Sequence, residues 1–150
     1  MHTPVLRDIA MHFRIAIEAI PESVRPIGMK QFPCGACGDA SLLLGAYLVD
    51  VGIHGFEYIC GERGSYTDNS WTSHAWLQRA SCVVDITADQ FNDAPSPVIV
   101  ADPSIWHMSF DAEEPTNADF RVFSGYGADV LHPMYARILE LLPLTLWSPE

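Results

Sequence analysis

A thiol, an imidazole and a carboxylate stand at Cys37, His74 and Asp85 of this chain of 150 residues. Cys37 opens a strongly apolar segment that is typical of a helix. A helix N-terminus favours a thiolate because its free amides and its dipole attract negative charge, and an adjacent imidazole has the same effect. These residue types in this chain order predict a nucleophilic Cys37, with His74 as its base and Asp85 orienting the imidazole.

The residues around Cys37 favour attack on a carbonyl group. Gly35 and Gly38 have no side chains, so a substrate carbonyl can come close to the backbone. The free amides at the start of the helix could bind the oxyanion formed on attack, and each such donor lowers the barrier by about 3 kcal/mol. Gln31 is a candidate for a further donor to the oxyanion, through its side-chain amide.

Two apolar runs hold the imidazole and the carboxylate. The runs 73–77 and 82–86 are expected to be strands, joined by a hairpin turn at 79–81. Such a hairpin could bring Asp85 beside His74, and a charge inside an apolar run is costly unless it is paired. The alternative interpretations are a core histidine and a strand-end carboxylate that caps the following turn.

Other polar and aromatic residues offer weaker signals. The remaining histidines are His12, His54, His107 and His132. The first falls on the polar side of a predicted helix and the others at loops or element edges, so all four are weak candidates. Asp89 and Gln90 are expected to belong to the turn after the second run. Three aromatic residues fit either a substrate groove or the core: Tyr66, Trp71 and Trp106.

The pattern of apolar residues predicts an α+β fold. A helix is expected to start at Thr3–Pro4, present one apolar face and stop at Pro21. A second, almost wholly apolar helix is expected over 37–51. Strands are expected at 56–60, 73–77, 82–86 and 97–101, a polar loop at 62–69, and a last helix over 134–142, introduced by Pro133. This order predicts N-terminal helices and a central buried helix packed on a small antiparallel sheet.

The motifs also support a family resemblance. Gln31-x-x-Cys34-Gly35-x-Cys37 at the start of a helix resembles the active-site helix of papain-like cysteine proteases. Four segments are similar, in order, to the transglutaminase-like branch of the same fold: Gly35-Ala36-Cys37, Gly52-Ile53, His74-Ala75-Trp76 and Asp85-Ile86-Thr87. The resemblance covers roughly residues 30–91 and implies a papain-like (transglutaminase-like) fold.

By this resemblance Cys37 is the nucleophile, Gln31 the oxyanion donor and Cys34 a non-catalytic neighbour. The implied activity is that of a cysteine-dependent amide hydrolase or acyl transferase (a protease, amidase, deamidase or transglutaminase) acting through a thioester on Cys37. The substrate would be a peptide, a protein or a small amide, and no cofactor is needed. The sequence also resembles leader peptidases of lasso-peptide pathways, which act with a partner, so a helper protein is a further expectation.

Three alternatives compete with the proposed enzyme. The first is a papain-like module that binds peptides without catalysis. The second is a dithiol oxidoreductase that uses Cys34 and Cys37, although such proteins have an apolar strand just before the motif and residues 27–32 are partly polar. The third is a zinc site, but the other ligand-type residues stand alone on separate strands. Cys60 and Cys82 are expected to be small core residues.

Length and charge narrow the class of protein. A chain of 150 residues is expected to form one domain spanning 1–150. A net charge of -11 disfavours nucleic acid as a partner. No apolar run reaches the roughly 18 residues of a membrane span, because the run 42–51 is broken by Gly45 and Asp50. With no apolar signal segment, the expected location is cytoplasmic, or outside the cell by a route without a recognisable signal.

Overall fold

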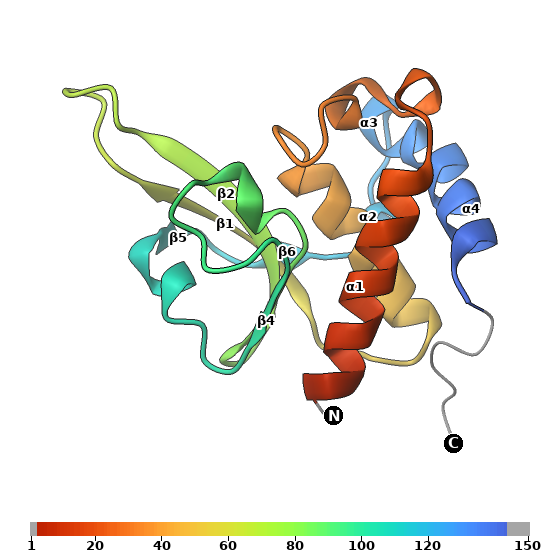
Figure 1. Ribbon diagram of the computed structural model, residues 1–150, viewed down its shortest axis with the longest axis horizontal. Coiled ribbons are helices and arrows are strands. Elements are labelled where there is room, and N and C mark those ends of the chain that lie inside the picture. Colours follow the sequence, from red (N-terminus) through yellow and green to blue (C-terminus); the bar gives the residue numbers. More distant parts are fainter. Residues whose placement is uncertain (1–2, 144–150) are drawn as a thin grey trace.

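Residues 3–143 are described by a computed structural model, in which helices pack on one antiparallel sheet (Figure 1). The helices are α1 (Thr3–Ala19), α2 (Cys37–Asp50), α3 (Tyr126–Asp129) and α4 (Leu131–Leu141). The strands are β1 (Glu57–Arg63), β2 (Thr72–Arg79), β3 (Cys82–Asp85), β4 (Ile99–Ala101), β5 (Asp111–Ala112) and β6 (Thr116–Asn117). Short 3-10 turns lie at Glu22–Val24, Ile27–Met29, Ala88–Gln90, Trp106–Ser109 and Phe120–Val122. The predicted α+β class is confirmed.

The first two helices follow their apolar patterns. In α1 the residues Ile9, Phe13 and Ile17 are fully buried, and the helix ends just before Pro21, as predicted. In α2 most side chains are buried on every side, which makes it the central helix. Gly52 follows α2 with a φ of 84° and ends it, since an L side chain rarely adopts that conformation.

The sheet has the strand order β4-β3-β2-β1-β5, with β6 also paired to β1. The hairpin between β2 and β3 closes at Arg79 opposite Cys82, as predicted. The predicted loop at 62–69 is wrong at its start, because β1 continues to Arg63. Cross-strand pairing with β2 keeps these polar residues extended although their composition is typical of a loop.

The sheet opens at the point where the functional residues lie. The pairing of β2 with β3 covers only Leu77–Arg79, so residues 72–76 have no β3 partner on that side. Helix α2 packs against β2, and the backbone N–H of Ala75 is one of the groups that lower the pKa of Cys37. The backbone of β2 and its His74 side chain therefore both lie near the start of the helix.

Hydrophobic side chains cover both faces of the sheet. The main core lies between the sheet and the helices, with Phe13, Leu44 and Leu77 fully or almost fully buried in it. A smaller cluster covers the other face and contains Ile59, Trp76, Val83 and Phe110, with Phe91 and Trp106 packed against it. The smaller cluster surrounds His74, as described below.

The segment 102–131, which has no clear sequence pattern, contains short strands, 3-10 turns and α3. The last helix begins at Leu131, two residues before the predicted start at Pro133. Proline is accepted there because its missing N–H lies in the first turn, where backbone N–H groups have no partner in the helix. Among residues 3–143 no helix has both the length and the hydropathy to cross a membrane.

Candidate active site

Cys37 is the first residue of α2 and follows a tight turn. Gly35 in that turn has a φ of 70°, and there is open space where a Cβ would lie, so the backbone is accessible beside the thiol. The N–H of Ala36 bonds to the carbonyl of Pro33 at 3.3 Å, which holds the turn. Cys37 is half-buried at the start of the helix, whereas Cys34 is exposed.

His74 lies inside a cage of aromatic rings. Its side chain is fully buried, and four rings approach it from β2 and from the loops over the smaller cluster, with centroids 5.0–5.9 Å away: Trp76, Phe91, Trp106 and Phe110. Nε2 of His74 donates to Oδ2 of Asp85 at 2.6 Å. This bond leaves Nδ1 for the side of the ring that meets Cys37 and Gln90.

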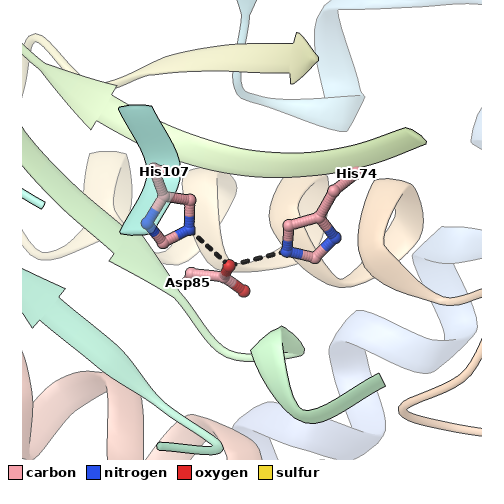
Figure 2. Close-up of side chains that lie close together, drawn as sticks. All are labelled: His74, Asp85 and His107. Atoms are coloured by element: carbon pink, nitrogen blue, oxygen red, sulfur yellow. Dashed lines mark hydrogen bonds and ion pairs between the residues drawn. The ribbon is translucent and has the colours of Figure 1, made fainter. Parts of the chain in front are cut away.

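Asp85 is the last residue of β3 and accepts hydrogen bonds from two imidazoles (Figure 2). His107 donates from Nε2 to the same Oδ2 atom at 2.7 Å, and the backbone N–H of Thr87 donates to Oδ1 at 2.9 Å. Burial of Asp85 favours its neutral form, but the bonds from His107 and His74 lower its pKa below the usual value. The carboxylate is therefore ionised although it is 1% exposed.

His107 extends this hydrogen-bonded chain by one further residue. Its Nδ1 lies 2.6 Å from Oγ of Ser104, and both residues are buried. From the sequence His107 is a weak candidate at a loop or element edge; it does lie in a loop, in the 3-10 turn Trp106–Ser109, but its side chain bonds to Asp85. The 3-10 turn Trp106–Ser109 packs over the smaller cluster and turns this side chain inward, onto Asp85.

The contact between Cys37 and His74 shifts the pKa of both groups. Burial opposes the thiolate, but hydrogen bonds from His74, from the Gln90 side chain and from the N–H of Ala75 lower the pKa of Cys37. Burial also opposes the imidazolium, whereas bonds to Asp85 and to Cys37 raise the pKa of His74 to about 9. The two shifts together favour a thiolate–imidazolium pair near neutral pH.

Gln90 reaches across the site from the 3-10 turn after β3. Its Nε2 lies 2.9 Å from Nδ1 of His74, and its Oε1 accepts from the N–H of Gly35 at 3.4 Å. The neighbouring Asp89 forms a two-pronged ion pair with Arg14 of α1, at 2.6 and 2.8 Å. Helix α1 thereby fixes the turn that carries Gln90.

Among residues 3–143, the Gln31 side chain forms no hydrogen bond with the groups around Cys37. It is exposed in the turn before α2 and lines a surface pocket of about 420 Å³ with Ile27, Gly28, Lys30, Cys34 and Gly35. Its role as an oxyanion donor stays a prediction. Cys60, which was expected in the core, is only half-buried, whereas Cys82 is buried as predicted.

The His74–Asp85–His107 cluster has ligand types that metals use, and its ligand atoms lie within 4.8 Å of one another. The two nitrogen–oxygen distances of 2.6 and 2.7 Å fit direct N–H···O bonds. A metal between these atoms, with bonds of about 2.0–2.2 Å, would hold them farther apart. The geometry therefore fits a hydrogen-bonded relay better than a metal site.

No family model, no curated protein and no solved structure matches this chain. The site must therefore be interpreted from its own geometry. Sequence reasoning named Cys37, His74 and Asp85, which the structure brings together, and missed Gln90 and His107. The sequence places Gln90 only in the turn after a buried strand, and the sequence around His107 has no pattern.

Proposed function

We propose that this chain is a cysteine-dependent acyl-transfer enzyme that cleaves an amide bond through a thioester on Cys37. The observation that carries the proposal is the contact of Cys37, at the start of a buried helix, with an imidazole whose far nitrogen bonds to Asp85 at 2.6 Å. A thiol in this setting is ionised near neutral pH and is a strong nucleophile.

The chemistry follows from the positions of the groups. The sulfur of Cys37 attacks the amide carbon, and the backbone amides at the start of α2 stabilise the oxyanion. His74 holds the proton on Nδ1, beside the sulfur, and gives it to the leaving amine. Asp85 stabilises the imidazolium and fixes the ring so that Nδ1 faces the sulfur. Water or an amine then attacks the thioester.

The order of the elements supports a papain-like fold of the transglutaminase-like branch. The nucleophile begins the central helix, and the histidine and aspartate lie on β2 and β3, the two strands of one antiparallel hairpin. Fold alone does not choose between hydrolysis and transfer to an amine. We propose hydrolysis, with a peptide, a protein or a small amide as substrate and a helper protein as partner.

An activated ester tests the proposed chemistry without knowledge of the natural substrate. p-Nitrophenyl acetate should acetylate Cys37, with a burst of nitrophenolate equal to the enzyme concentration, followed by slow turnover. Peptide mass spectrometry locates the acetyl group, and hydroxylamine should release it as expected for a thioester. His74→Ala should slow the burst by about 100-fold or more, since a general base contributes that much or more.

Two results would contradict the proposal. Acetylation of all exposed thiols at similar rates would show that Cys37 has no special reactivity. A burst that stays unchanged in His74→Ala would show that the imidazole does not activate the sulfur. The non-catalytic peptide-binding module predicts both of these results, and a dithiol oxidoreductase predicts insulin reduction that requires both Cys34 and Cys37.

A further inference from the structure

The side chain of Gln90 joins the two halves of the site. It accepts from the N–H of Gly35 in the turn before α2 at 3.4 Å and lies 2.9 Å from Nδ1 of His74, and it is one of the groups that lower the pKa of Cys37. The arrangement deepens the proposed function and rests on it, because it concerns the step in which the thiol loses its proton.

Hydrogen-bond partners fix which end of the Gln90 amide faces the sulfur. The N–H of Gly35 can only donate, so the amide oxygen must lie on that side. Nε2 of His74 donates to Asp85, so in a neutral ring Nδ1 is an acceptor and requires the NH2 end of Gln90. The NH2 group therefore faces both the imidazole and Cys37.

The bond from the amide must change when the proton moves. When the thiol and the imidazole are both neutral, Nδ1 accepts a hydrogen bond from Gln90. Once Nδ1 is protonated it is a donor and can no longer accept that bond. The sulfur, now an anion, becomes the acceptor for the same NH2 group, which is one of the groups that lower the pKa of Cys37. A hydrogen bond to an ion is about twice as strong as one between neutral groups, so this exchange favours the ion pair.

We propose that Gln90 is a further catalytic residue, whose side-chain NH2 transfers its hydrogen bond from His74 Nδ1 to the Cys37 sulfur as the thiol is deprotonated. The S–H bond breaks and its electron pair stays on sulfur, while an N–H bond forms at Nδ1. No atom enters or leaves. The Arg14–Asp89 ion pair next to Gln90 holds the amide in place, so little reorganisation accompanies the step.

The acidity of Cys37 reports on this bond directly. The measurement is the rate of alkylation of Cys37 by iodoacetamide as a function of pH, followed by peptide mass spectrometry. Gln90→Glu keeps the shape but replaces the donor by a carboxylate, and Gln90→Leu removes the donor without adding charge. Asn92→Asp, at an exposed position two residues away, is the matched control for added charge.

Both Gln90 variants should raise the apparent pKa of Cys37. Loss of a hydrogen bond to an ion corresponds to about a tenfold fall in ionisation, so alkylation below neutral pH should be about tenfold slower in Gln90→Leu and slower still in Gln90→Glu. Asn92→Asp should match the wild-type protein. Circular dichroism and thermal unfolding check that each variant is folded, and either variant alone is sufficient for the test.

The outcomes separate this inference from the proposed function. If wild-type Cys37 is acidic, loses that acidity in His74→Ala and keeps it in both Gln90 variants, the role of Gln90 is refuted and the proposed function stands. If wild-type Cys37 titrates as an ordinary thiol whatever residue stands at position 74, both are refuted.

Discussion

The carboxylate of Asp85 is shared by two imidazoles, and this decides where the thiol proton can go. A carboxylate with a single partner in a buried place could take the proton from the imidazolium. Asp85 accepts from His74, His107 and the backbone of Thr87, and the bonds from the two imidazoles lower its pKa despite burial. The proton taken from Cys37 therefore stays on His74, where a leaving amine can receive it.

The protonation of His74 gives the first prediction. Asp85 and Cys37 both stabilise the imidazolium, so the ring should titrate with a midpoint of about 9 by NMR. Removing either neighbour should lower that midpoint, and Cys37→Ser and Asp85→Asn test this in turn. A wild-type midpoint at or below 6.5, the ordinary value for histidine, would mean that the two neighbours do not hold the proton.

His107 gives the second prediction. His107→Ala deprives buried Asp85 of a donor and should lower the free energy of unfolding by about 1–3 kcal/mol, measured with urea. In a double-mutant cycle with Asp85→Asn, the two losses should fail to add, by about 1 kcal/mol or more. The control is His54→Ala at an exposed position, expected within about 0.5 kcal/mol of wild type. Additive losses would show that the two side chains are independent.

At the level of elements, helix α1 holds in place two turns that border the site. Arg14 is 8% exposed, and it donates to Asp89 twice and to the carbonyl of Ile86 at 3.0 Å. Its guanidinium also lies over the ring of Phe32, 5.2 Å from the centroid. One side chain of α1 thus contacts the turn before α2 and the turn after β3.

Arg14→Ala tests this support. The change leaves the buried Ile86 carbonyl without its donor, whereas water can reach Asp89, whose side chain is 32% exposed. The free energy of unfolding should therefore fall by about 1–3 kcal/mol. Arg137→Ala removes an exposed arginine of α4 and should change it by less than about 0.5 kcal/mol. Equal effects of the two changes, measured by urea unfolding, would show that Arg14 is an ordinary surface cation.

The position of α2 depends on a close approach at Gly45. A Cβ there would lie 2.0 Å from the carbonyl oxygen of Ala118, so Gly45→Ala should push the helix outward and cost about 3 kcal/mol of stability. Gly127→Ala, in a helix with open space at that point, should be neutral or stabilising. Thermal unfolding compares the pair, and a Gly45→Ala protein as stable as the wild type would contradict the observed packing.

For the whole molecule, the sequence predicts elements with strong periodicity and misses those shaped by distant contacts. The apolar stripe of α1, the all-apolar α2 and the hairpin after His74 depend on local patterns, and the structure has them. The segment 102–131 has no such pattern, because its short strands and turns are held by pairing with β1 and by packing on the sheet. Those contacts cannot be predicted from composition alone.

The same difference explains which residues of the site can be predicted from the sequence. Cys37, His74 and Asp85 could be named because each stands at a recognisable place, at a helix start or on an apolar strand. Gln90 and His107 act through side chains that reach across loops, and nothing in their neighbourhood predicts the direction of that reach. Gln31 illustrates the converse, since its spacing predicts an oxyanion donor while its side chain lies exposed at the edge of a pocket.

The central claim is that His74 activates Cys37, and a competition among the four cysteines tests it most directly. A limiting dose of iodoacetamide near pH 6.5, with the label on each cysteine quantified by mass spectrometry, compares Cys37 with the more exposed Cys34 in the same molecule. Exposure alone would make Cys34 the faster.

We predict that Cys37 reacts about tenfold or more faster than Cys34, since ionisation rather than access sets the rate of thiol alkylation. In His74→Ala this advantage should disappear. Faster labelling of Cys34 in the wild-type protein, or a Cys37 rate that is unchanged without the imidazole, would contradict the claim.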